Sequence, residues 1–178
     1  MEESSPTDSV IRPNSGHIFI TPFGFHLYAT DFLTSAKNFP PSDRFSPVPY
    51  YCYCRAIELC LKAFLLGKGI SKDDLKNRKQ FGHDLVKLVD HAMKLGVTEL
   101  VDLSKARLEC VGKANDYYAA KGFEYFDLHN AVRGYSGLPT LALLDELASE
   151  LVSRLEQYCM DVTDNPPSTS VNRPSRPA

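Results

Sequence analysis

Apolar side chains recur at helical spacing through most of the central part of this chain. The clearest case follows Pro139, where apolar positions are separated by alternating intervals of three and four residues: Leu141, Leu144, Ala148, Leu151, Leu155, Tyr158 and Val162. Such intervals place side chains on one face of an α-helix. Asp145, Glu150 and Arg154 fall outside this stripe. The pattern therefore predicts a long amphipathic helix with one buried face.

The segment from Tyr50 to Leu66 has a different pattern, because it is apolar nearly all round. Its charged residues are Arg55, Glu58 and Lys62. A helix without a continuous polar face is typical of the centre of a helical bundle. Two prolines precede the segment and two glycines follow it, which sets its expected ends.

Three further segments carry apolar residues at helical spacing. They are residues 22–38 with Phe23, Leu27, Thr30 and Leu33, residues 83–95 with Leu85, Leu88, Val89, Ala92 and Leu95, and residues 98–119 with Leu100, Leu103, Leu108, Val111, Ala114 and Tyr118. Strand signals are few, and we expect extended backbone only within residues 122–128. The sequence therefore predicts an all-α fold, an up-and-down helical bundle of about five helices.

Both ends of the chain differ in composition from this core. Six of the 12 prolines lie in the end segments, and residues 164–178 contain one apolar side chain of any size, Val171. Such segments cannot bury enough surface to offset the entropy lost on ordering, so we expect them to be disordered. The predicted organisation is a tail over residues 1–16, a helical domain over 17–163 and a second tail over 164–178.

Charge and hydropathy exclude several classes of protein. Lys and Arg number 20 and Asp and Glu 22, so the net charge of −2 argues against a protein that coats nucleic acid by bulk charge. No apolar run approaches the roughly 20 residues of a membrane-spanning helix, so we expect no membrane association. Residues 1–15 have no apolar core, which argues against a signal peptide.

The five cysteines are odd in number, and their spacing is not that of a small domain held together by disulfides. Without a secretory signal we expect reduced, packed thiols in a cytoplasmic protein. No CxxC pair or His pair completes a zinc set, so the sequence predicts no metal site and no cofactor.

Charged residues inside the central helix are the first candidates for chemistry. Glu58 stands three residues after Arg55 and four before Lys62, so the three side chains share one face. A buried carboxylate needs a partner, and we expect one from His83 or Asp84, at the start of the next predicted helix. Two interpretations remain open: a structural tie of Glu58 with His83 and Asp84, or an acid–base pair of Glu58 with His83.

Two stretches, RAIELCLKAFLLGKGI (residues 55–70) and FGHDLVKLVDHAMKLG (residues 81–96), resemble HEPN domains, the prokaryotic and eukaryotic nucleotide-binding helical bundles. The resemblance covers roughly residues 20–162. It implies a homodimer in a bacterial or archaeal cytoplasm, with an operon-encoded partner in a toxin–antitoxin or phage-defence system. Many HEPN proteins are metal-independent ribonucleases, in which an Arg stabilises charge on the phosphate and a His moves a proton.

The stretch that compares with the ribonuclease motif runs from Leu128 to Tyr135. Here His129 precedes Arg133, which reverses the family order, and the two residues stand one position closer together. Leu138 occupies a position after Arg133 where a family His could stand. The reversal exchanges the backbone positions of the two side chains, so we expect a polar pocket that grips phosphate or a nucleobase rather than cleavage.

The connector over residues 120–138 holds the predicted ligand-binding residues. They combine aromatic rings with cations and polar groups: Tyr125, His129, Asn130, Arg133 and Tyr135. Such a combination can stack bases and hold phosphate, although the aromatics also suit a loop packed on the bundle. The leading hypothesis is a non-catalytic HEPN-like module that binds nucleotide, RNA or a protein partner. The alternatives are a metal-independent ribonuclease using Arg133 with His129 or His83, and a purely structural protein–protein adaptor.

Overall fold

The computed structural model describes residues 20–77, 79–125 and 134–166. Its helices are α1 (Pro22–Lys37), α2 (Val48–Gly67), α3 (Lys72–Lys76), α4 (Leu85–Lys94), α5 (Lys105–Tyr118) and α7 (Leu141–Asp164), with a short 3₁₀ helix at Val97–Glu99. No strand occurs among these residues. The predicted all-α class is therefore confirmed for the part of the chain that is described.

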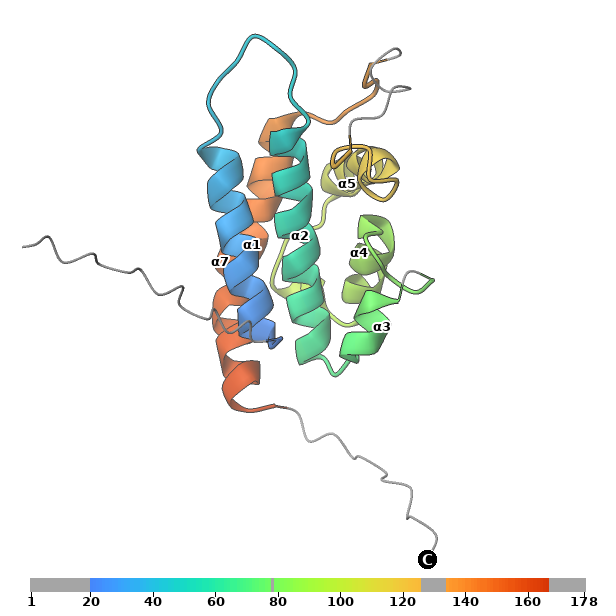
Figure 1. Cartoon of the computed structure of the whole chain (residues 1–178). Coiled ribbons are helices and arrows are strands. Elements are labelled where there is room, and N and C mark those ends of the chain that lie inside the picture. Colours follow the sequence, from blue (N-terminus) through green and yellow to red (C-terminus); the bar gives the residue numbers. More distant parts are fainter. Residues whose placement is uncertain (1–19, 78, 126–133, 167–178) are drawn as a thin grey trace, which may run out of the picture.

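Three long helices form the main body of the molecule, and α2 lies at its centre (Figure 1). Helix α1 runs opposite in direction to α2 and α7 (Figure 1). Helix α2 packs against α1, α7, α3, α4 and α5, so nearly every face of it meets another helix. This surrounding explains why the segment is apolar nearly all round, and it confirms the predicted central position.

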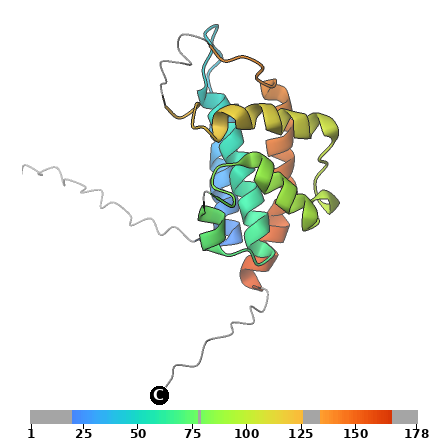
Figure 2. The same cartoon turned by 90° about the vertical axis from the view of Figure 1, so that its right-hand side faces the viewer.

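The shorter helices pack on the side of α2 away from α1, and they depart from a simple up-and-down order. Helix α5 is seen end-on in Figure 1 and along its length in Figure 2, which is turned by 90°. Its axis therefore crosses the long helices. The predicted up-and-down order therefore holds for α1 and α2 alone among the long helices, because α2 and α7 run in the same direction (Figure 1) and α5 crosses them.

The structure corrects several predictions about the bounds and buried faces of individual helices. The helix expected over residues 98–119 begins only at Lys105, after the separate 3₁₀ turn. On α1 the buried face is formed by His26, Ala29, Leu33 and Ala36, whereas Leu27 is 50% exposed. Residues 122–124 form turns rather than a strand, and the rest of that segment lies mostly outside the described residues. Helix α3 has no counterpart among the predicted elements, because five residues are too few to show a helical period.

All five cysteines are buried and unpaired. In the described part of the chain, no helix combines the length and the apolar character that crossing a membrane requires. Residues 1–16 and most of 164–178, the predicted tails, lie outside the described residues, and α7 continues to Asp164.

Candidate functional site

Glu58 lies in the middle of α2 with no exposed surface, and four side chains converge on its carboxylate. Arg55 Nη1 lies 3.0 Å from both oxygens, and Lys62 Nζ lies 2.6 Å from Oε1. His83 Nδ1 lies 3.1 Å from Oε2, and the hydroxyl of Tyr118 donates to the same oxygen. We call these five residues the Glu58 cluster. It joins α2, the end of α5 and the turn before α4.

Hydrogen bonds from Lys62 of α2 and Asn115 of α5 hold the turn before α4 in place. Lys62 Nζ also donates to the carbonyl of Gly82 at 2.7 Å, and Gly82 has the positive φ of +51° that this turn requires. Asp84 caps α4, accepting from the backbone N–H of Lys87 at 3.1 Å, and also accepts from Asn115 Nδ2 at 3.2 Å. The structure thus brings Glu58 and His83 together, whereas the Asp84 carboxylate contacts Lys87 and Asn115.

The charge state of the cluster follows from these contacts. Burial opposes ionisation of Glu58, but the hydrogen bond with His83 and the charges of Lys62 and Arg55 outweigh it and lower its pKa to about 2. Burial and the neighbouring carboxylate both raise the pKa of Tyr118, so its hydroxyl stays protonated and donates. Near neutral pH the Glu58 carboxylate is therefore ionised, and it lies between the side chains of Arg55 and Lys62.

A cavity of about 340 Å³ opens beside the Glu58 cluster. Its polar lining consists of Arg55, Glu58, Lys62, His83 and two lysines of α3, Lys72 and Lys76. Ile20, Phe25, Leu59 and Leu75 supply most of the apolar lining. Four cations against one carboxylate concentrate positive charge here, although the whole chain is slightly acidic. We call this the basic cavity, and such a lining favours an anionic ligand.

Helix α3 places its two lysines at the cavity through one anchoring residue. Leu75 is 1% exposed, whereas Lys72 and Lys76 are exposed. Ser71 caps the helix by accepting from the backbone N–H of Asp74 at 3.0 Å. Lys72 and Lys76 stand four residues apart, so they share one face. Sequence reasoning missed them, because nothing in a five-residue helix indicates which distant helix it packs against.

The predicted connector site is described only in part. His129, Asn130 and Arg133 lie outside the described residues. Tyr125 is 63% exposed, with Lys121 Nζ 5.3 Å from its ring centroid. The hydroxyl of Tyr135 donates to the carbonyl of Gly122 at 2.7 Å, and its ring packs among Phe45, Tyr117 and Phe123. The contacts of Tyr135 are those of a segment packed on the bundle by its aromatics.

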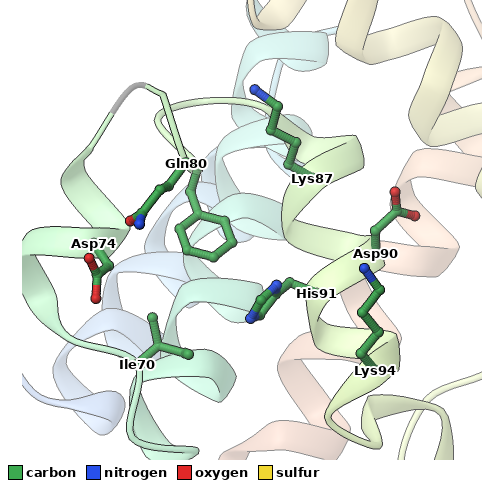
Figure 3. A pocket seen from close by; sticks show the side chains of 8 residues that line it. Ile70, Asp74, Gln80, Lys87, Asp90, His91 and Lys94 are labelled. Atoms are coloured by element: carbon green, nitrogen blue, oxygen red, sulfur yellow. The ribbon is translucent and has the colours of Figure 1, made fainter.

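A further hollow of about 400 Å³ lies between α3 and α4 (Figure 3). Asp74 and Gln80 lie on one side, and His91, Asp90 and Lys94 of α4 lie on the other (Figure 3). The ring of His91 stands edge-on to Phe81, with centroids 5.1 Å apart. Acidic and basic side chains are balanced around this hollow, so its lining favours neither an anion nor a cation.

No family model, curated protein or solved structure matches the chain. The resemblance to HEPN domains therefore stays a prediction. Within residues 20–77, 79–125 and 134–166, no group of three or more His, Cys, Asp or Glu side chains is arranged to hold a metal ion.

Proposed function

We propose that this chain is a HEPN-like helical module that binds the phosphate group of a nucleotide or RNA in the basic cavity without cleaving it. The observation that carries the proposal is the lining of that cavity, four cations against one carboxylate. Hydrogen bonds between ionised partners are shorter and stronger than neutral ones, which makes a phosphate the favoured occupant. The homodimer and the operon-encoded partner rest on the sequence resemblance.

The cluster prepares part of the cavity for an anion before one arrives. Glu58 holds Arg55 and Lys62 by direct contacts, so their positions are fixed by the fold. Lys72 and Lys76 are exposed and free of such a contact with Glu58, so their full charge is available to a ligand. Fixing cations in advance lowers the entropy lost on binding.

Binding without cleavage follows from the groups that could move protons. Attack by an RNA 2′-hydroxyl needs a base, and departure of the leaving oxygen needs an acid. Of the residues lining the basic cavity, His83 is the one histidine, the residue type that most often transfers protons in catalysis. Its Nδ1 lies against Glu58, so one ring nitrogen remains for a ligand. A single such group supports phosphate binding better than a two-step proton transfer.

One observation keeps the metal-independent ribonuclease as the second candidate. Glu58 Oε2 lies 3.1 Å from His83 Nδ1, and a carboxylate in that position orients the imidazole of many acid–base sites. Arg55 Nη1 lies 3.5 Å from the same nitrogen, where a cation can stabilise phosphate charge. In this alternative Arg133, with His129 or His83, completes the chemistry.

Isothermal titration calorimetry with AMP and a single-stranded RNA oligomer tests the binding proposal. The double variant Lys72→Glu/Lys76→Glu should lower the affinity for both ligands at least about tenfold, because two cations become two anions at the cavity. The matched control, Lys105→Glu/Lys113→Glu, makes the same charge change at exposed positions of α5 and should have a less than roughly twofold effect. Equal losses in the two double variants would show that bulk charge, not the basic cavity, binds the ligand.

A nuclease assay separates the two candidate functions. Purified protein incubated with RNA in EDTA should leave the RNA intact. Cleavage that disappears in His83→Ala or Arg133→Ala would overturn the non-catalytic part of the proposal and establish the ribonuclease.

A further inference from the structure

A second cavity adjoins the basic cavity along α1 and α2. It measures about 320 Å³ and is lined by Ile20, Gly24, Phe25, Tyr28, Phe32, Arg55 and Leu59. Four of these residues, Ile20, Phe25, Arg55 and Leu59, also line the basic cavity. Because the same side chains border both spaces, the two cavities are neighbouring parts of one groove.

The two parts of this groove differ in chemistry. Phe25, Tyr28 and Phe32 stand three and four residues apart on α1, so their rings share one face. Tyr28 is 41% exposed, and the other two rings are half-buried, so a ligand can reach this aromatic part. Arg55 is its one charged lining residue, and the guanidinium carbon lies 5.9 Å from the centroid of the Phe32 ring. Arg55 therefore lies at the junction of the two parts.

We propose that the groove binds a phosphomonoester joined to a flat aromatic ring, with the phosphate in the basic cavity and the ring against Phe25, Tyr28 and Phe32. This inference rests on the proposed phosphate site and names the class of ligand. Aromatic side chains stack on the faces of nucleobases, and Arg55 can contact the ligand between its phosphate and its ring. Each part has the volume of a small-ligand subsite, near 300 Å³.

A purine nucleotide carries this combination of groups in two settings, as a free mononucleotide or as the 5′-phosphorylated end of an RNA strand. Both present one phosphomonoester and one ring a short distance apart. The internal nucleotides of a strand carry diesters with one negative charge each, which satisfy four cations less well than the dianion of a monoester. The groove therefore favours a terminal or free nucleotide over the middle of a strand.

Adjacent residues of α1 provide a matched pair of variants. Tyr28 lines the aromatic part of the groove, whereas Leu27, the residue before it, lines neither cavity. Both side chains are large and exposed, Tyr28 at 41% and Leu27 at 50%, so replacing either by alanine leaves the bundle core intact. Circular dichroism of each variant verifies the fold before binding is measured.

The test is calorimetric titration of the full chain and these two variants with AMP, ribose 5-phosphate, adenosine and inorganic phosphate. Wild-type protein should bind AMP about tenfold more tightly than ribose 5-phosphate, since one stacked base contributes a factor of roughly 5 to 150. Tyr28→Ala should remove this advantage and leave the affinity for ribose 5-phosphate unchanged. Leu27→Ala should change neither affinity.

The outcomes separate this inference from the function it rests on. If AMP and ribose 5-phosphate bind equally well, or if Tyr28→Ala lowers both affinities by the same factor, the proposal that a ring binds in the aromatic part of the groove is wrong. The phosphate site stands in that case. If none of the phosphates binds, both proposals fall. A 5′-phosphorylated RNA oligomer that binds as tightly as AMP identifies a strand end as the ligand, and a weaker one identifies the free nucleotide. Either result supports the shared chemistry.

Discussion

Replacing Glu58 by glutamine keeps the shape of the side chain and removes its charge. The carboxylate oxygens accept from Arg55, Lys62, His83 and Tyr118. In Glu58→Gln one oxygen becomes an NH₂ group, which is itself a donor and must face at least one of these donors. Lys62, which is 8% exposed, then loses its anionic partner, and Gly82 O and at most one amide oxygen of the glutamine are left to accept from it.

The structure allows the size of this effect to be worked out in two ways. Lowering the pKa of Glu58 from its ordinary 4.5 to about 2 corresponds to about 3 kcal/mol of stability near neutral pH. Removing one partner from a buried ion pair costs about 3–5 kcal/mol in general. Both routes predict that Glu58→Gln lowers the free energy of unfolding by about 3–5 kcal/mol at pH 7.

Urea unfolding followed by far-UV circular dichroism measures the difference. The control variant is Glu109→Gln, because Glu109 pairs with Lys105 at the same four-residue spacing but in solvent, at 3.9 Å. An exposed pair of that kind contributes less than about 1 kcal/mol, so the control should stay close to wild type.

The pH dependence gives the sign of the effect. A carboxyl whose pKa is lowered by folding stabilises the protein fully above its unfolded value, and this stabilisation is lost as the pH falls toward its folded value. The advantage of wild type over Glu58→Gln should therefore be complete at pH 7 and shrink from about pH 4.5 toward pH 2. The reasoning is refuted if Glu58→Gln matches the control at pH 7, or if the advantage is the same at pH 3 as at pH 7.

Two other predictions concern packing. A Cβ added at Gly67 would lie 2.6 Å from Tyr158 Oη and 2.8 Å from Val162 Cγ2, so Gly67→Ala should lower the free energy of unfolding by about 1–3 kcal/mol in urea titrations. A Cβ added at Gly112 meets no atom within 4 Å, so Gly112→Ala should stabilise α5 by about 0.5–1 kcal/mol. Equal effects of the two substitutions would contradict the close approach of α2 and α7. All five thiols are buried, so a disulfide reagent at pH 8 should react with none in the native protein and with five in urea; rapid reaction of the native protein would contradict that burial.

The helices that sequence predicted well are those whose pattern is long enough to show a period. The apolar stripe predicted the 24-residue helix α7, and the nearly continuous apolar sequence of α2 predicted its position at the centre of the bundle. The break before Lys105 could not be predicted, because the leucines on both sides of it continue one apparent helical pattern. On α1 the buried face includes His26, whose Nε2 lies 2.7 Å from Val152 O, a contact that depends on tertiary packing.

The candidate site also combines residues that local spacing predicts with residues that only tertiary packing brings together. The three- and four-residue intervals of Arg55, Glu58 and Lys62 are enough to predict that they share one face of α2. Tyr118 lies 60 residues from Glu58 in the chain, and its approach depends on how α5 crosses the bundle. Lys72 reaches the basic cavity because α3 folds back against α2. Contacts of this kind have no local signal in the sequence.

Titration of ¹⁵N-labelled protein with AMP, followed by the chemical shifts of its backbone amides, tests phosphate binding in the basic cavity most directly. We expect the largest shift changes at Lys72, Lys76 and His83 around that cavity. Changes confined to the neighbourhood of Tyr125 and Tyr135, with none around the basic cavity, would contradict the proposed site.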